Sequence, residues 1–587
     1  MQLKQTRGPR SFPNPLRAAP EEAQPVQFFD ALAWLALVVA LVVLFATFRD
    51  YGVPWDAEGE VKYGKLLVRY YTSWFRDHSA FEFINFRFYG GGFELPFALI
   101  SKLSPFGVYE TRHLVSGLLG IVGMAATWRL ARALGGARAG AVAAWLLMLN
   151  PSWYGHSFIN VRDVPFGAGM ITCLLLSLRM LDELPRISWR SALAFGLALG
   201  LTTSVRVGGV LALVFLLAPI GLWWLGRLRA PELRATLLQD TLRIAGSLLH
   251  VIGAAYAVIA VLWPWAIQSP LNPWRALTMF SRFPFEENVL FDGKLVPASD
   301  LPASYLPVQF VVRQPESLLL GLAAVGLIAL WGLRRLSRAR VAALTESSGL
   351  RWFAVAFAGL FPFVYFIALR PVAYNGMRHF LFVVPTLTAL AALAYDRLLQ
   401  APARPLRLAL AGGLLVAGVA QTRELVELHP NQYVYFNHLV GGVNGAEGRF
   451  ELDFWGTSLA EAAEEFADEL ESRGDLPEGN EAPFKIYVCG NMWSAALFFP
   501  RGLEPVSSIE QADFQIAINN HFCKHPTGSR QLLDVKREGA VLSYVDDMRS
   551  LRRNPKPAES VDRPAVSAKQ HGAAERERGI APPRPRL

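Results

Sequence analysis

The stretch that decides the fold reads DALAWLALVVALVVLFATF and occupies residues 30–48. A helix needs roughly 20 mainly apolar residues to cross the hydrocarbon core of a bilayer. This run is close to that length, is too long for the apolar core of a signal peptide, and is not followed by a small-residue cleavage site. It therefore predicts a retained membrane-spanning helix, preceded by a polar, proline-rich cytoplasmic tail at residues 1–27.

The composition of the whole chain agrees with a membrane protein. Of the 587 residues, 52% are apolar and only 18% are charged, whereas a soluble domain carries about a quarter charged residues. These values exclude a disordered chain and disfavour a purely soluble enzyme. The formal charge of +9 lies mostly in short loops, so it indicates membrane topology rather than nucleic-acid binding. The three cysteines form no Cys/His cluster, so a structural zinc or haem site is not supported.

Ten further apolar runs predict a mainly α-helical polytopic protein with about 11 spans. They lie at about 113–130, 138–155, 164–181, 190–206, 207–225, 244–264, 316–333, 352–369, 379–396 and 406–421. With the N-terminus in the cytoplasm, every inner loop contains three or more arginines, as the positive-inside rule requires. The outer segments are then 49–112, 151–163, 265–315, 370–378 and 422–587. A miscount by one span would move the last of these to the cytoplasm.

The long outer loop 49–112 contains a second helical pattern. Tyr63, Leu67 and Trp74 follow Asp56 at helical spacing, which predicts an amphipathic helix in the membrane interface. The apolar stretch 93–103 is too short to span and is interpreted as another interfacial or re-entrant piece. The proline-rich outer loop 265–315 is placed where it could cover a site.

The C-terminal part reads as a small α/β domain over residues 422–548. Residues 458–473 are predicted to be a helix, and Phe484–Cys489, Asp513–Asn519 and Leu532–Val545 to be strands. Cys489 and Cys523 both follow strand candidates, and a disulfide and two buried free thiols are equally compatible with the sequence. Residues 549–587 are rich in Pro, Arg, Ala and Glu and are predicted to be disordered.

Two acidic residues stand at outer ends of predicted spans, where charge is costly and tends to mark a site. Asp56, in VPWDAEGE at residues 53–60, either accepts a proton from a hydroxyl or caps the following helix. Asp163, in HSFINVRDVP at residues 156–165, could likewise be the N-cap of the helix that follows it. A cap does not explain the polar residues crowded around Asp163, which are His156, Asn160 and Arg162.

Two arginines lie on the same predicted side as these acids. Arg206 interrupts an apolar stretch, and Arg378 lies in YNGMRHF at residues 374–380. Positive-inside bias disfavours arginine there, so a buried phosphate or carboxylate partner is favoured over snorkelling to head groups. The sequence has no nucleotide-binding loop, which indicates that the substrate is not a cytoplasmic nucleotide.

Taken together, these motifs resemble membrane glycosyltransferases of family 39 in the GT-C class, which include protein O-mannosyltransferases and the lipid A aminoarabinose transferase. The resemblance covers roughly residues 28–440 and implies a GT-C-like domain over 28–421 with periplasmic loops 49–112 and 265–315. It is carried by Trp55–Glu58, Asn160–Pro165, Phe291–Lys294 with Leu301–Pro307, Tyr374–Phe380 and His429–Asn437. Many members have adjacent Asp-Glu in the first loop, whereas here Ala57 separates Asp56 from Glu58.

The resemblance implies an inverting transfer of a sugar from a polyprenyl-phosphate donor to a hydroxyl of a lipid, polysaccharide or protein, at the periplasmic face of a bacterial inner membrane. Asp56 would act as the base, and Arg378 and Arg206 would stabilise the departing phosphate. Asp163 with Arg162 would orient Asp56 or bind the acceptor. The remaining expected substrate-binding residues are Glu58, His156, Asn160, Tyr374 and His379. No cofactor or metal ligand is expected, and a divalent cation at the donor phosphate is left open.

Two other classes of function compete with this one. A transporter or lipid flippase should show paired repeats or charges at mid-depth of the membrane, and the sequence shows neither. A sensor or scaffold acting through its C-terminal domain would leave the outer acids and arginines unexplained.

Overall fold

The structure is a computed structural model, and it describes residues 26–281, 283, 285–334, 344–477 and 481–553. Most of the predicted tails, 1–27 and 549–587, lies outside the described residues. Each of the eleven apolar runs contains a helix. These helices are α1 (Val26–Thr47), α5 (Val108–Gly135), α6 (Ala137–Met148), α8 (Asp163–Asp182), α9 (Trp189–Val205), α10 (Leu211–Arg229), α12 (Leu237–Leu262), α16 (Glu316–Leu333), α18 (Ser347–Leu369), α19 (Val383–Leu398) and α20 (Arg404–Glu427).

Within the described part of the chain, eight helices are long and apolar enough to cross a membrane. The other three predicted spans are the shorter helices α6, α9 and α19, with 12, 17 and 16 residues. The run 138–155 is shortened because it breaks after Met148. There Asn150 accepts a hydrogen bond from the Trp153 amide at 3.0 Å, and Pro151 starts a separate helix, α7 (Pro151–Ile159). The chain is a multi-pass membrane protein.

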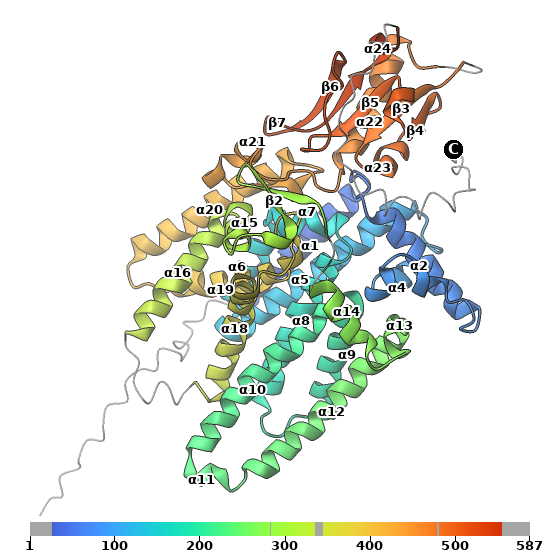
Figure 1. The fold of residues 1–587 in the computed structure, drawn as a ribbon. Coiled ribbons are helices and arrows are strands. Elements are labelled where there is room, and N and C mark those ends of the chain that lie inside the picture. Colours follow the sequence, from blue (N-terminus) through green and yellow to red (C-terminus); the bar gives the residue numbers. More distant parts are fainter. Residues whose placement is uncertain (1–25, 282, 284, 335–343, 478–480, 554–587) are drawn as a thin grey trace, which may run out of the picture.

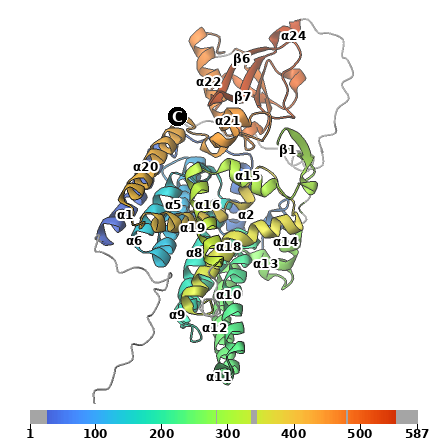
Figure 2. The same ribbon diagram turned by 90° about the vertical axis from the view of Figure 1, so that its left-hand side faces the viewer.

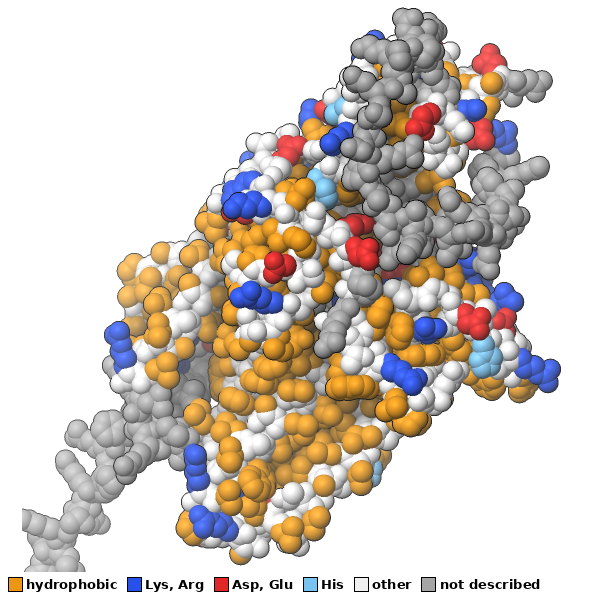
Figure 3. All heavy atoms as spheres, in the orientation of Figure 1, with side chains coloured by type: hydrophobic (Ala, Val, Ile, Leu, Met, Phe, Trp, Pro, Cys, Tyr) orange, Lys and Arg blue, Asp and Glu red, His pale blue; other side chains and the backbone are white. Residues whose placement is uncertain are grey.

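The helices form a bundle with the small sheet domain beyond one end of it (Figures 1 and 2). Helix α19 is buried from Val383 to Asp396 and packs against α5, α6 and α16. Helices α16 and α20 bury only two residues each and stand at the left edge in Figure 1. Hydrophobic side chains cover most of the visible surface of the bundle in Figure 3, as expected for a surface in contact with lipid.

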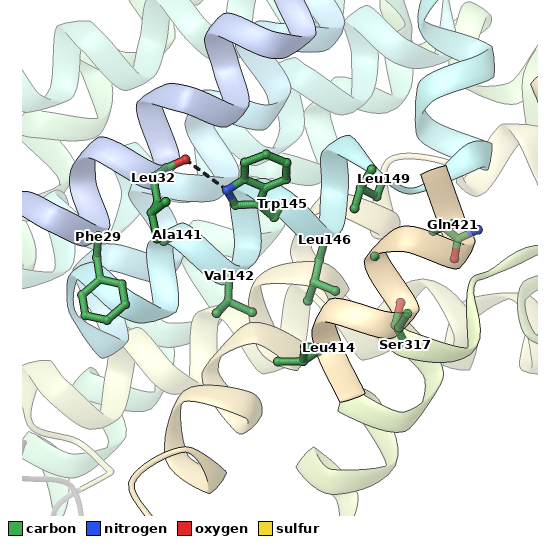
Figure 4. Close-up of a pocket in the computed structure, with 12 residues that line it drawn as sticks. Phe29, Leu32, Ala141, Val142, Trp145, Leu146, Leu149, Ser317, Leu414 and Gln421 are labelled. Atoms are coloured by element: carbon green, nitrogen blue, oxygen red, sulfur yellow. Dashed lines mark hydrogen bonds between the residues drawn. The ribbon is translucent and has the colours of Figure 1, made fainter. Parts of the chain in front are cut away.

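An apolar cavity lies between α1, α6, α16 and α20 (Figure 4). Its lining is hydrophobic except for Ser317 and Gln421, and it includes no charged residue. Trp145 closes one side, where its indole N–H donates to the Leu32 carbonyl at 3.1 Å. Its walls therefore offer apolar contact but no acid–base chemistry.

The outer loop 49–112 folds into α2 (Ala57–Thr72), α3 (Ser79–Glu82), η1 (Phe86–Phe88) and α4 (Glu94–Ile100). The predicted amphipathic helix is present as α2, with Tyr63 and Leu67 buried. A Cβ on Gly64 would lie 2.6 Å from the Glu94 carbonyl oxygen, so the glycine permits the close approach of α2 to α4. Trp74, which the helical spacing placed on the same helix, lies beyond the end of α2, and its side chain is 82% exposed.

The loop 265–315 is more ordered than the sequence indicated. It contains α14 (Asn272–Ser281) and α15 (Tyr305–Arg313), after a short helix α13 (Pro264–Ile267). Between them an antiparallel hairpin pairs β1 (Asn288–Phe291) with β2 (Lys294–Pro297). Asp292 and Gly293 form its turn with φ of +47° and +78°, a conformation that Asp-Gly favours.

The C-terminal domain is the predicted small α/β unit. Its five strands, in the order β4-β3-β5-β7-β6, are β3 (Phe484–Cys489), β4 (Leu503–Val506), β5 (Phe514–Ile518), β6 (Arg530–Arg537) and β7 (Ala540–Asp547). Strand β3 pairs in parallel with β4 and β5, and the other pairs are antiparallel. Helix α22 (Ser458–Arg473) packs on the sheet through Phe466, whose ring centre is 4.8 Å from that of Phe514. Cys489 and Cys523 form a disulfide, so the first of the two open alternatives is correct.

Residues 432–457 join this domain to the helical bundle. The Trp55 amide donates to the Trp455 carbonyl at 3.1 Å, and Asn491 donates to the Trp55 carbonyl at 2.9 Å. The first outer loop thus contacts the C-terminal part on both sides of Trp55, next to Asp56.

Candidate active site

A polar cavity lies where the ends of several helices meet the loop 49–112. Its lining comes from the start of α2, the α7–α8 turn, the residue after α9, the turn before α19 and the joining segment. The lining residues are Pro54, Asp56, Glu60, Ile159, Asn160, Val161, Arg162, Asp163, Arg206, Arg378 and Trp455. Six residues singled out from the sequence are therefore brought together here, from four separate parts of the chain.

Asp56 occupies the N-cap position of α2, but its side chain makes no capping hydrogen bond. Instead one carboxylate oxygen lies 3.8 Å from Nη1 of Arg378. The side chain keeps 53% of its accessible surface because it faces the open cavity, although protein atoms crowd the recess around it. This crowding disfavours the charged form and raises the pKa of Asp56, against the opposing effect of the Arg378 guanidinium.

Asp163 is the first residue of α8 and is 2% exposed. The Asn160 side chain binds the backbone at the start of α8, where its Oδ1 accepts a hydrogen bond from the Asp163 amide at 2.8 Å. Its Nδ2 also donates to Oδ2 of Asp163 at 2.8 Å. The other carboxylate oxygen, Oδ1, lies 2.8 Å from Nη1 of Arg206, an ion pair whose angles are not those of a hydrogen bond. Arg206 thus has the carboxylate partner that its position in the sequence favoured.

Glu60 is a cavity residue that the sequence reasoning missed. It is buried and bridges two guanidinium groups, with Nη2 of Arg112 and Nε of Arg162 both 2.5 Å away. Arg112, which is 1% exposed, also binds both oxygens of Glu94 at 2.9 Å. Burial alone would raise the pKa of Glu60, but the two arginines outweigh this effect and lower it. Glu60 therefore stays ionised.

The position of Glu60 could have been predicted from its helical spacing relative to Asp56. The amide of Glu60 donates to the Asp56 carbonyl, which is the first hydrogen bond of α2. Residues four apart share a helix face, so Glu60 follows Asp56 into the cavity. Glu58 lies between them, is exposed, and does not line the cavity.

Arg378 is 8% exposed and packs against two aromatic rings. Its guanidinium carbon is 4.9 Å from the ring centre of Tyr374 and 5.1 Å from that of Trp455. Its Nε has no hydrogen-bond partner among the described residues. Tyr374 and His379 do not line the cavity, and their ring centres are 4.7 Å apart. Trp455 was not foreseen, because it belongs to the C-terminal part.

His156 is the remaining predicted residue, and it is buried just behind the cavity. Its ring lies 5.4 Å from that of Trp455 and 5.8 Å from that of Tyr433. Burial lowers the pKa of His156 to about 3, so the imidazole is neutral. It does not line the cavity and supports the Trp455 ring instead.

The charges of the cavity balance. Three carboxylates, Asp56, Glu60 and Asp163, face three guanidinium groups, Arg162, Arg206 and Arg378. A carboxylate beside an arginine with a spare donor offers a proton acceptor next to an anion site. In the described ranges, no group of three or more His, Cys, Asp or Glu side chains is arranged to hold a metal ion.

No protein-family model and no curated protein matches this sequence. Several solved structures resemble its structure at low identity. ArnT from Cupriavidus metallidurans, in the apo state, has a TM-score of 0.45 and 15% identity, covering 90% of this chain and 100% of that one. The same protein bound to undecaprenyl phosphate has a TM-score of 0.43, 15% identity, and coverage of 89% and 98%. The Archaeoglobus fulgidus oligosaccharyltransferase has a TM-score of 0.46, 12% identity, and coverage of 84% and 65%.

Likenesses with TM-scores below 0.5 carry no argument about function.

Proposed function

We propose that this protein is a membrane glycosyltransferase that moves a sugar from a polyprenyl-phosphate donor to a hydroxyl acceptor with inversion. The observation that carries the proposal is the Asp56–Arg378 pair, 3.8 Å apart, at the mouth of a helical bundle. It places a proton acceptor beside an anion-binding group in one cavity, so a sugar phosphate that enters between them meets both.

In this reaction the acceptor oxygen attacks the anomeric carbon of the donor sugar. Asp56 takes the hydroxyl proton as the new glycosidic bond forms, and its raised pKa makes it a stronger base than an ordinary aspartate. The bond between the anomeric carbon and the phosphate oxygen breaks, and its electron pair leaves with the phosphate. Arg378 stabilises the negative charge that grows there.

The other charged residues shape the cavity around these two. Asp163 is held by Asn160 and Arg206, and Arg162 is held by Glu60. Neither Asp163 nor Arg162 is paired with Asp56. The proposed role of Asp163 is to position Arg206, and both residues are proposed to bind hydroxyls of the sugar or the acceptor. The arginines supply the positive charge that a phosphate needs, and the proposal requires no cofactor.

The site is proposed to face the periplasm of a bacterial inner membrane, with the N-terminus in the cytoplasm. The arginines of the alternate loops support this orientation. The Cys489–Cys523 disulfide also supports it, because disulfides persist in oxidising compartments such as the periplasm.

The test begins with cells that carry or lack the gene. Mass spectrometry of envelope lipids, polysaccharides and proteins should show one hexose, pentose or amino sugar missing without the gene. That product defines the assay for Asp56→Asn, which should insert and fold but lose nearly all sugar transfer. The matched control is Asp292→Asn, which also neutralises a carboxylate, at an exposed turn where asparagine tolerates the positive φ. Full transfer by Asp56→Asn would remove Asp56 as the base.

A further inference from the structure

The three ion pairs of the cavity differ in how firmly each acid is held. Glu60 contacts two guanidinium groups at 2.5 Å, and Asp163 has Arg206 and Asn160 at 2.8 Å. Among the described residues, Asp56 has only Arg378 as an ion-pair partner, at 3.8 Å, which is longer than a hydrogen bond. Asp56 is also far more exposed than the other two acids. Its pair with Arg378 is therefore the weakest of the three.

Arg378 has unused capacity to bind an anion. Its Nε is buried and has no hydrogen-bond partner in the described chain, and its guanidinium carbon lies 4.9 Å from the ring centre of Tyr374 and 5.1 Å from that of Trp455. A guanidinium group binds phosphate best through two parallel N–H donors. The single long contact to Asp56 does not use that geometry.

We propose that the donor phosphate displaces the Asp56 carboxylate from Arg378, so that the resting ion pair is exchanged when the donor binds. This inference rests on the proposed function and adds a binding order to it. A phosphate bound to Arg378 through two N–H donors competes with Asp56 for the guanidinium group, and this pair is the longest of the three in the cavity. The Asp56 side chain makes no capping hydrogen bond to α2. It can therefore move away from Arg378 without breaking a hydrogen bond of the helix. An acceptor hydroxyl then meets a free base only after the donor is in place.

The exchange makes phosphate binding depend on the charge of Asp56. The charged groups that face Asp56 are Glu60 on its own helix, Arg162 and Asp163 at the start of α8, and Arg378 before α19. Of these, Glu60, Arg162 and Asp163 are held by other partners, and Arg378 alone is released when Asp56 is neutralised. A neutral Asp56 no longer competes for Arg378, so phosphate affinity should rise as pH falls through the titration of Asp56.

The probe is a short-chain polyprenyl methyl phosphate diester, which contains no sugar to transfer and keeps one negative charge across the pH range. Its binding is measured on the full-length protein in nanodiscs by isothermal titration calorimetry. Asp56→Asn should bind the diester on the order of tenfold more tightly than the wild type, because a half-exposed pair is partly screened by water. Wild-type affinity should increase at low pH, and that of Asp56→Asn should not change.

Asp163→Asn is the matched control, since it removes one negative charge from the same cavity without touching Arg378. It should gain clearly less affinity than Asp56→Asn. Equal gains in both variants would mean a general field effect, and a larger gain in Asp163→Asn would make Arg206 the phosphate partner. Either result overturns the exchange, as does unchanged or weaker binding in Asp56→Asn.

Failure of the exchange and failure of the proposed function give different results. If the wild type binds the diester and Asp56→Asn gains nothing, only the exchange is wrong. If neither the wild type nor any variant binds it, both are wrong. Thermal unfolding of each variant confirms that the comparison is made on folded protein.

Discussion

Two halves of the same cavity are built in opposite ways. On one side, the lining residues Glu60 and Arg162 belong to a largely buried network that continues behind them to Arg112 and Glu94, and each acid in it contacts at least one guanidinium group at 2.9 Å or less. On the other side, Asp56 and Arg378 are 3.8 Å apart, and Asp56 is half exposed. The difference indicates that the first half fixes the position of α2 and α4, while the second keeps groups available for substrate.

The largest effect is expected from a substitution in the open half of the cavity, which contains Asp56 and Arg378. Asp56→Asn should lower sugar transfer by about 10²- to 10⁴-fold, because a positioned base contributes a factor of that size. Its melting temperature should stay near that of the wild type, since a half-exposed pair adds little stability. The measurements are the transfer rate with the identified donor and thermal unfolding in detergent. A large drop in melting temperature would place Asp56 in the structural half instead.

Breaking the buried half should mainly destabilise the protein. Arg112→Ala leaves Glu60 and Glu94 as buried carboxylates short of a partner, and losing one member of such a network costs about 3–5 kcal/mol. The control is Arg449→Ala, whose exposed pair with Asp292 should be worth less than about 1 kcal/mol. Denaturant or thermal unfolding compares the two. Equal stability in both variants would contradict the division of the cavity.

Within the open half, Arg378 should act on the donor. Arg378→Ala removes the guanidinium group that binds the phosphate, and hydrogen bonds to a charged group are worth about 1.5–3 kcal/mol, or roughly 10- to 100-fold. The KM for the lipid donor should therefore increase by that factor, while the KM for the acceptor changes little. Steady-state kinetics with each substrate varied in turn test this. An unchanged donor KM would assign the phosphate to another group.

The smallest effect is a shift in pH dependence. Transfer needs ionised Asp56, so the rate should fall as pH drops through its pKa, and this acid limb should lie above the ordinary value of about 3.9. Arg378 opposes the shift, so Arg378→Ala should move the limb to higher pH. Because the pKa of Asp56 is raised in the folded protein, its ionisation lowers the free energy of unfolding as pH rises from the ordinary value to the raised one. An acid limb at the ordinary value in both proteins would show that Asp56 is not in a crowded recess.

Much of the cavity was predictable from positions along the chain. Asp163, Arg206 and Arg378 interrupt or border apolar runs, where an uncompensated charge is costly, so each was recognisable as a candidate. Glu60 was missed because a carboxylate in a loop with several acids looks like a solvated one. Arg112 was missed for a related reason, since it lies at the edge of the second predicted span. The Trp455 ring could not be assigned, because residue 455 lies far along the chain from every other residue of the cavity.

The sequence alone determined that eleven apolar runs become helices and that a small α/β domain follows them. These properties depend on local hydrophobicity and on hydrogen bonds within one segment, so neighbouring residues are sufficient to predict them. Only the tertiary structure decided which acid pairs with which arginine. Asp56 and Arg378 are more than 300 residues apart in the chain, and an ion pair forms only where packing brings two such segments within a few ångströms.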